Sequence, residues 1–216
     1  MSAVLIDVWS DFVCPFCYLA EPALDRVARE QADSVQITWR AFELRPDPEP
    51  LLDPAGDYLR DIWSESVQPM AAERGMTLRL PPVQPRSRLA HLAAAYARQQ
   101  GRAAAMHTAI FRAFFERGEN IGQVAVLIRL ATEIGLDPCQ FAEALSAGEC
   151  LHLALEDEET AHELGISGVP AMVVRRAGDG FERAILVEGA QSYEVIMDAV
   201  GRVARGEASL PEPPAE

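Results

Sequence analysis

Hydrophobic and polar residues follow two different periods along the chain, and its opening segment shows both. Segment 2–10, SAVLIDVWS, alternates weakly and is rich in Val, Leu and Ile, which predicts a β-strand. From Pro15 to about Ala32 the apolar residues recur every three or four positions, which predicts a helix with Pro15 in its first turn. Segment 34–44, SVQITWRAFEL, predicts a second strand. We therefore expect two parallel strands joined by a right-handed helical crossover.

Residues 57–164 keep the helical period almost throughout. The apolar positions predict helices at roughly 57–75, 87–100, 102–117, 122–135, 138–147 and 149–164. A glycine follows each periodic stretch, as is typical of helix C-termini: Gly75, Gly101, Gly118, Gly135, Gly148 and Gly165. Asp137 followed by Pro138 predicts a capped helix start.

After residue 165 the period returns to two. AMVVRR and FERAILVEG predict two strands of a hairpin around the turn AGDG, and SYEVIMDAVGRVARG predicts a closing helix. The order βαβ, helical block, ββα predicts an α/β fold with a small mixed sheet. We expect residues 1–50 and 165–206 to form the sheet-containing domain, 51–164 an inserted all-helical domain, and 207–216 a C-terminal tail.

Composition narrows the function classes. The chain has 216 residues, 49% hydrophobic and 24% charged, which suits one large domain or a domain with an insertion. Its net charge of −14 opposes binding to nucleic acid. No apolar run reaches membrane-spanning length, and the N-terminus lacks the basic and apolar regions of a secretory signal. We interpret the protein as cytoplasmic, where paired cysteines are more often catalytic or metal-binding than structural.

Cys14 and Cys17 are two residues apart, between the first predicted strand and its helix, in the motif CPFC. A thiol at a helix N-terminus meets unsatisfied backbone N–H groups and the positive end of the helix dipole, which favour its thiolate form. Cys17 lies one turn further on, within reach for a disulfide. The spacing predicts that Cys14 is a nucleophile and Cys17 the thiol that resolves its mixed disulfides.

Two other interpretations of the pair are open. A structural zinc site needs four ligands, but Cys139 and Cys150, eleven positions apart, are the only other cysteines, and no histidine has a paired spacing. We assign no metal ligand. The second alternative is that Cys14 and Cys17 are two inert buried residues. Cys139, near a predicted helix start, is expected to be a small buried residue, with a reactive second thiol as the alternative, and a Cys139–Cys150 bridge is disfavoured.

Other segments suggest substrate contacts. In GISGVPAMVV, Pro170 opens a predicted strand; a cis bond there turns the chain so that the Val169 backbone faces an extended substrate, whereas a trans bond makes an ordinary turn. Phe12 and Phe16 beside the cysteines suggest an exposed apolar rim for a peptide. His91 lies on an apolar helical face, which favours a packed side chain, with a cleft wall as the alternative.

A resemblance joins these motifs. DFVCPFCYLAEPALDRV, ITWRAFELRPDPEP, AHLAAAYARQQGRAAAMHTAIFRAFFERGENIG, LGISGVPAMVV and VEGAQSYEVI resemble, in this order, segments of the DsbA family of thioredoxin-fold oxidoreductases, in its cytoplasmic FrnE-like branch. The likeness runs from about Val4 to Arg205. It implies a thioredoxin fold with an inserted all-helical domain, and dithiol–disulfide exchange with protein or peptide substrates. The attacking cysteine falls on Cys14, the resolving cysteine on Cys17 and the cis-proline on Pro170.

The chain departs from that branch at a few positions. Phe16 stands where tryptophan is usual, Arg86 where an asparagine often stands, and VPAM replaces the commoner VPTF. These differences bear on substrate choice and redox poise, since neighbouring residues tune thiolate stability.

Two rival functions remain on the same scaffold. Glutathione-dependent 2-hydroxychromene-2-carboxylate isomerases and kappa-class transferases resemble it too, but a serine usually takes the first motif position there, so having both Cys14 and Cys17 argues against this activity. The other rival is a chaperone or binding module whose disulfide switches an apolar surface. No metal or organic cofactor is expected, and glutathione is a candidate redox partner.

Overall fold

The computed structural model describes residues 3–207. Contacts divide the chain into a sheet unit, comprising 1–10, 16–42 and 157–216, and a helical unit, comprising 11–15 and 43–156. The helical unit therefore starts and ends about eight residues earlier than the range 51–164 suggested by the sequence. It also takes in the short segment 11–15 near the N-terminus. The tail expected at 207–216 lies outside the described residues apart from Glu207.

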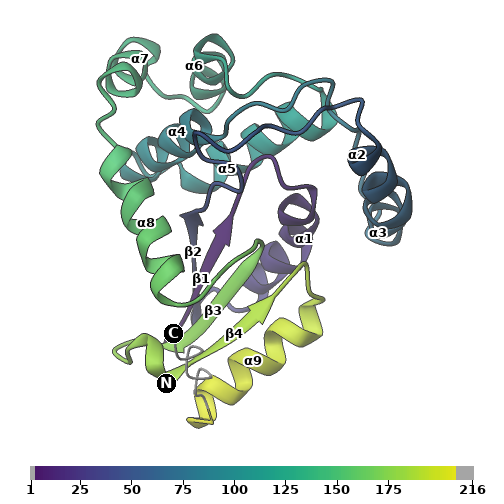
Figure 1. Ribbon diagram of the computed structural model, residues 1–216. Coiled ribbons are helices and arrows are strands. Elements are labelled where there is room, and N and C mark those ends of the chain that lie inside the picture. Colours follow the sequence, from purple (N-terminus) through teal and green to yellow (C-terminus); the bar gives the residue numbers. More distant parts are fainter. Residues whose placement is uncertain (1–2, 208–216) are drawn as a thin grey trace. The chain divides into compact units, whose positions relative to one another are not determined.

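A four-stranded mixed sheet forms the centre of the sheet unit (Figure 1). Its strands are β1 (Val4–Ser10), β2 (Val35–Ala41), β3 (Ala171–Arg176) and β4 (Ala184–Glu188), in the order β2-β1-β3-β4. β1 pairs in parallel with β2 and antiparallel with β3, and β3 pairs antiparallel with β4. The α/β fold, the parallel opening pair and the hairpin are thus confirmed.

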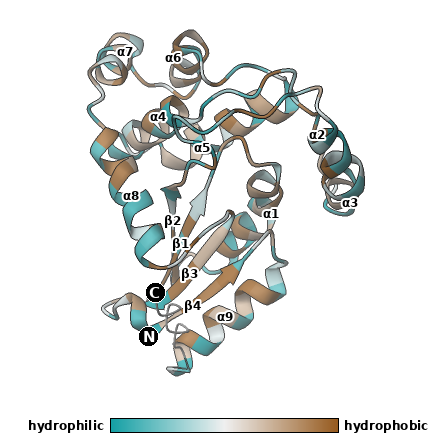
Figure 2. Cartoon of the chain, in the orientation of Figure 1, coloured by the Kyte–Doolittle hydropathy of each residue, from teal (hydrophilic) through white to brown (hydrophobic). Residues whose placement is uncertain are grey.

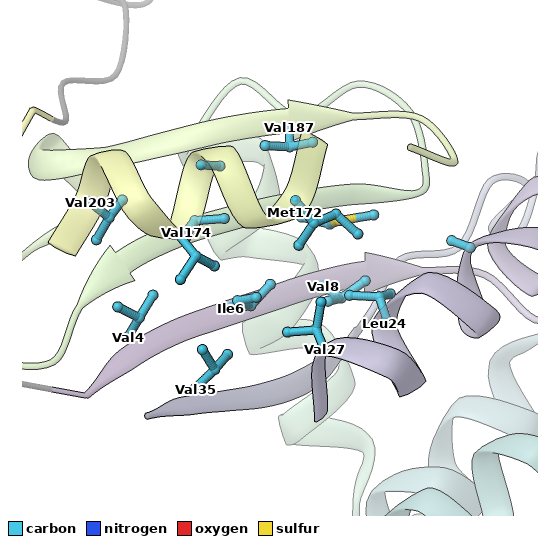
Figure 3. Close-up of a cluster of buried hydrophobic side chains, with 14 residues drawn as sticks. Val4, Ile6, Val8, Leu24, Val27, Val35, Met172, Val174, Val187 and Val203 are labelled. Carbon is cyan, nitrogen blue, oxygen red and sulfur yellow. The ribbon is translucent and has the colours of Figure 1, made fainter. Parts of the chain in front are cut away.

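One face of the sheet packs against two helices, α1 (Pro15–Glu30) and α9 (Tyr193–Arg205). Alternate residues of β1 point to this face and meet Leu24 and Val27 of α1, as Figure 3 shows. Brown and teal residues alternate along α9 in Figure 2 because only one side of this helix is buried. Burying each large aliphatic side chain contributes roughly 1.5–3 kcal/mol, so this cluster carries much of the unit's stability.

The opposite face combines apolar packing with a buried ionic network. Trp9, Val173 and Ala161 of α8 (Leu151–Glu163) belong to its apolar cluster. Beside them the Arg40 guanidinium donates to Asp7 Oδ1 at 2.8 Å and to Asp157 Oδ1 at 2.9 Å. Although burial lowers it, hydrogen bonds and charges from Asp157 and Asp7 leave the pKa of Arg40 raised. The network therefore ties β1 and β2 to the C-terminal part of α8.

The helical unit contains most of the predicted helices. They are α2 (Asp57–Ile62), α3 (Gln68–Glu73), α4 (Arg88–Gln99), α5 (Ala103–Phe111), α6 (Val124–Glu133), α7 (Pro138–Ala147) and the first residues of α8. Two π-helical segments fall within predicted helices: η1 (Trp63–Val67) interrupts the helix predicted at 57–75, and η2 (Arg112–Glu116) forms the C-terminal end of the helix predicted at 102–117. The Trp63 and Phe115 rings, one from each π segment, are 6.1 Å apart. The segments thus contact each other through aromatic packing that the helical period does not reveal.

The predicted helix ends are confirmed by the backbone. All six glycines named above have positive φ, from 64° at Gly75 to 84° at Gly135, which favours glycine. The Asp137 side chain accepts hydrogen bonds from Cys139 N and Gln140 N, so it caps α7 as predicted. Within residues 3–207 no helix is long and apolar enough to cross a membrane.

The second predicted hairpin strand was wrong at its start. Phe181–Arg183 forms a 3-10 turn, η3, and β4 begins only at Ala184. The Arg183 N–H donates to Gly180 O at 3.3 Å, and the Arg175 guanidinium lies 4.9 Å from the centre of the Phe181 ring. These contacts hold the segment in a turn although its sequence has strand-like alternation.

The ionic network gives a stability prediction. Arg40→Met leaves the Asp7 and Asp157 carboxylates, both buried, without their shared cation. We expect the free energy of unfolding to fall by about 3 kcal/mol, measured by urea denaturation with circular dichroism. Arg205→Met is the control, because its ion pair with Glu207 is exposed to solvent and should contribute little to stability. Equal losses in both variants would contradict the structural role assigned to Arg40.

Candidate active site

The two cysteines of the motif lie where a strand turns into a helix. β1 ends at Ser10, a short turn follows, and α1 begins at Pro15, so Cys14 directly precedes the helix and Cys17 lies in its first turn. The Cys14 N–H donates to the Asp11 carbonyl oxygen at 3.0 Å, which closes the turn. This is the strand-then-helix context that the sequence predicts for a redox motif.

Neither cysteine is disulfide-bonded in the structure, and both are buried: 4% of Cys14 is exposed and none of Cys17. The first turn of α1 contains no acidic side chain that would oppose a negative charge there. Its backbone N–H groups have no acceptors within the helix, and the helix dipole places its positive end at this turn. The start of α1 thus presents backbone N–H donors and no acidic side chain next to Cys14.

Asp11, which the sequence did not single out, organises the turn that carries Cys14. It is completely buried. Its Oδ1 accepts the Val13 N–H at 3.3 Å, and its Oδ2 accepts the Leu44 N–H at 2.8 Å. The carboxylate thus connects the turn to the segment that follows β2. An aspartate two residues before a turn amide is a known turn signal, and this could have identified Asp11 from the sequence.

Phe12 is not part of an exposed rim, which corrects the expectation for this residue. It is 3% exposed, and its ring centre lies 5.0 Å from those of His91 and Phe111 and 5.1 Å from that of His107. These neighbours come from α4 and α5, which cover the ring. Phe16, on the other hand, is half-buried and keeps part of its surface accessible.

His91 is a packed side chain, as its apolar surroundings predict. It is buried in the first part of α4, and its Nε2 lies 3.4 Å from Asp11 Oδ1. This separation is within ion-pair range, but Nε2 makes no hydrogen bond to the described residues, because the geometry is unfavourable for one. The imidazole therefore lies against the turn that leads to Cys14.

Val169 and Pro170 lie directly before β3, and the peptide bond between them is cis. Ala171 pairs with Trp9, so β3 starts at the sheet edge where β1 ends, and from there it runs antiparallel to β1, away from the motif. Val169 is half-buried, Pro170 is buried, and the Pro170 carbonyl accepts the Gly189 N–H at 2.8 Å. The GVP segment, which precedes β3, and the end of β1, which precedes CPFC, thus lie at the same edge of the sheet.

The remaining cysteines have different environments. Cys139, expected to be buried, is exposed, because the Asp137 cap holds the start of α7 at the surface. Cys150 is buried, and its Sγ lies 3.8 Å from Gln99 Oε1. Burial and the Glu149 charge raise the pKa of the Cys150 thiol, against a smaller lowering by Arg98. Among the described residues, no group of three or more His, Cys, Asp or Glu side chains could hold a metal ion.

Comparison with known proteins places the chain in one family. The model of the DSBA-like thioredoxin domain matches residues 5–201. The chain therefore belongs to the family of DSBA-like thioredoxin domains, a class of thiol–disulfide oxidoreductases. Uncharacterized protein YwbO of Bacillus subtilis is 35% identical over 193 residues, which cover 84% of this chain and 96% of that protein.

Several solved structures share the fold. A probable DsbA oxidoreductase from Streptomyces coelicolor has a TM-score of 0.78 and 23% identity, over 99% of this chain and 93% of that one. A 2-hydroxychromene-2-carboxylate isomerase has a TM-score of 0.73 and 22% identity, over 94% and 97%. The cytosolic disulfide reductase DsbM from Pseudomonas aeruginosa, solved with glutathione, has a TM-score of 0.67 and 21% identity, over 92% and 99%.

The two cysteines outside the motif should differ in reactivity. In a Cys14→Ser/Cys17→Ser variant we expect iodoacetamide at neutral pH to modify Cys139 roughly ten times faster or more than Cys150, because Cys150 is buried and its pKa is raised. The difference should narrow as the pH rises, since more of Cys150 becomes thiolate. Peptide mass spectrometry over time measures both rates. Equal rates in the folded protein, with unfolded protein as the control, would contradict these environments.

Proposed function

We propose that this protein exchanges disulfides with protein or peptide thiols through Cys14 and Cys17, by way of a mixed disulfide. The observation that supports this most strongly is the position of the two cysteines at the start of α1, one directly before the helix and one in its first turn. Two cysteines at this position of a thioredoxin-like fold have the spacing that exchange through a mixed disulfide requires.

The reaction proceeds in two displacements. The Cys14 thiolate attacks one sulfur of a substrate disulfide, a new S–S bond forms, and the other substrate sulfur leaves as a thiolate that takes a proton from water. The deprotonated Cys17 sulfur then attacks Cys14, closes the Cys14–Cys17 disulfide and releases the second substrate thiol. The substrate gains two electrons and the protein loses two. The reverse sequence oxidises a substrate dithiol.

Substrate contacts are proposed for Val169, Pro170 and Phe16. The first two are supported by their place before β3, at the edge where β1 ends, where an extended peptide would run alongside the strand start. Phe16 lies between the cysteines and is accessible enough to contact an apolar substrate group. Phe12 and His91, also candidates from the sequence, are buried, and we assign them a supporting role behind the turn.

Glutathione is the redox partner that we propose. Two glutathione thiols restore the reduced pair by the same exchange and become glutathione disulfide, which balances the two electrons. The glutathione-bound DsbM structure supports this choice, as does that protein's cytosolic origin, which fits the cytoplasmic location and the FrnE-like branch suggested by the sequence. No other cofactor enters the proposed reaction.

A glutathione-dependent isomerase is the second candidate, favoured by the fold similarity to 2-hydroxychromene-2-carboxylate isomerase. The presence of both Cys14 and Cys17 supports exchange instead, since isomerisation has no use for a resolving thiol. Measuring isomerisation of 2-hydroxychromene-2-carboxylate with glutathione separates the two. Turnover that survives in a Cys17→Ser variant would favour the isomerase.

The proposed nucleophile can be tested directly. Cys14→Ser should reduce insulin reduction by dithiothreitol to the uncatalysed rate, because a serine hydroxyl cannot form the mixed disulfide. Cys139→Ser is the matched control and should keep wild-type activity, since Cys139 is exposed and lies outside the motif. If neither the wild type nor Cys14→Ser reduces insulin while both bind an unfolded client, a chaperone or binding module replaces the exchange proposal.

The role of Cys17 predicts a trapped intermediate. Cys17→Ser should accumulate a mixed disulfide at Cys14 when incubated with glutathione disulfide, because no second thiol is present to release it. Intact-mass spectrometry detects the added glutathione, and peptide mapping locates it on Cys14. The Cys14→Ser variant serves as the control and should show no adduct at the motif. Equal adduct levels in wild type and Cys17→Ser would rule out Cys17 as the resolving thiol.

A further inference from the structure

The boundary between the two units runs through the CPFC motif. Segment 11–15, with Cys14, groups with the helical unit, whereas the chain from Phe16 onward, with Cys17, groups with the sheet unit. The turn that carries Cys14 therefore has its main contacts in the helical unit. The residues that hold this turn in place therefore determine how firmly the Cys14 sulfur is positioned.

Asp11 supplies the backbone contacts of this turn. Its carbonyl oxygen accepts the Cys14 N–H, its Oδ1 accepts the Val13 N–H, and its Oδ2 accepts the Leu44 N–H. A carboxylate without any exposed surface is costly unless its oxygens are hydrogen-bonded, so these bonds also determine where the side chain can lie. Any shift of Asp11 moves the amide of Cys14 with it.

His91 lies next to two residues of the turn, Phe12 and Asp11. Its ring centre is 5.0 Å from that of Phe12, and its Nε2 is 3.4 Å from Asp11 Oδ1. The imidazole is 5% exposed and Nε2 has no hydrogen-bond partner among residues 3–207, which is uncommon for a buried polar atom. An unsatisfied nitrogen so close to a buried carboxylate can form a charge-assisted hydrogen bond after a small rearrangement of the turn.

We infer that Asp11 and His91 form a positioning pair through which the helical unit holds the turn that carries Cys14. This inference rests on the proposed exchange function. Three sulfur atoms must lie nearly in line during each displacement, so misplacing the Cys14 sulfur slows the chemical step more than it weakens substrate binding. Neither residue touches the substrate in this role. Both act by fixing the amide and side chain of the nucleophile.

The test compares Asp11→Ala, Asp11→Asn, His91→Phe and the Asp11→Asn/His91→Phe double variant in the full chain. Asp157→Asn is the control, because Asp157 is also a buried carboxylate and also accepts a backbone N–H, that of Ala41 at 3.1 Å, but takes no part in the turn. Two properties are measured: kcat and KM for insulin reduction, and the alkylation rate of Cys14 by iodoacetamide in a Cys17→Ser background.

We expect Asp11→Ala to lower kcat by roughly tenfold or more while KM changes by less than about twofold. Asp11→Asn should lose less, since its carbonyl oxygen still accepts one backbone N–H. His91→Phe keeps a ring beside Phe12 and should lower kcat several-fold. Because the residues act as a pair, the double variant should lose less than the product of the two single losses. The alkylation rates should follow the same order, and Asp157→Asn should match wild type.

Three results would overturn the inference. The first is that kcat and the alkylation rate stay within about twofold of the control in every variant. The second is that KM rises while kcat is unchanged. The third is that the loss of kcat in the double variant equals the product of the losses in the two single variants. If Asp11→Ala does not fold, as judged by circular dichroism, Asp11→Asn and His91→Phe decide the outcome. Alkylation requires no disulfide substrate, so the pair remains testable in a protein that does not reduce insulin.

Discussion

Strand β1 is paired with a neighbour on each side, and this pairing places the groups of the proposed site. It runs parallel to β2 and antiparallel to β3, so the end of β1 and the start of β3 fall at one edge of the sheet. A slip of one residue would exchange the two faces of the strand and bring Trp9 to the face of Ile6. The apolar clusters on both faces oppose this slip, as does the hydrogen bond from Trp9 Nε1 to Asp157 O at 2.7 Å. Packing far from the cysteines thus determines where their strand ends.

Buried carboxylates have a common role in both units. Asp7 and Asp157 join strands to α8 through Arg40, and Asp11 joins the turn before Cys14 to the segment after β2. A buried charge contributes little net stability compared with an apolar residue of the same size, but a bonded one permits few alternative geometries. Through their hydrogen-bond and ion-pair partners, these three aspartates therefore help to specify how the backbone segments are arranged.

Local signals predicted the elements, and long-range contacts account for what was missed. Glycine and proline positions marked the helix ends, and apolar alternation marked the strands, because both signals act within a few residues. The π segments depend on packing such as that of Trp63 on Phe115, which are 52 positions apart in the chain. The same distinction applies to the site. The sequence of the CPFC motif alone predicts a candidate redox site. The contact of Asp11 with His91 cannot be predicted in this way, because it forms only when α4 packs against the turn.

The small exposure of Cys14 bears on the partners that this site accepts. Only 4% of the residue is accessible, yet displacement at sulfur needs an approach along a single line, so a narrow opening is sufficient for exchange. A disulfide embedded in a folded surface cannot bring its sulfur so close without collisions, whereas glutathione or a flexible peptide segment presents its sulfur on a thin chain. Phe16, between the two cysteines in the sequence, is half-buried, and in the proposed exchange its accessible part would be available to an apolar substrate group. In the proposed exchange, the burial of Cys14 would therefore favour flexible substrates over disulfides embedded in a folded surface.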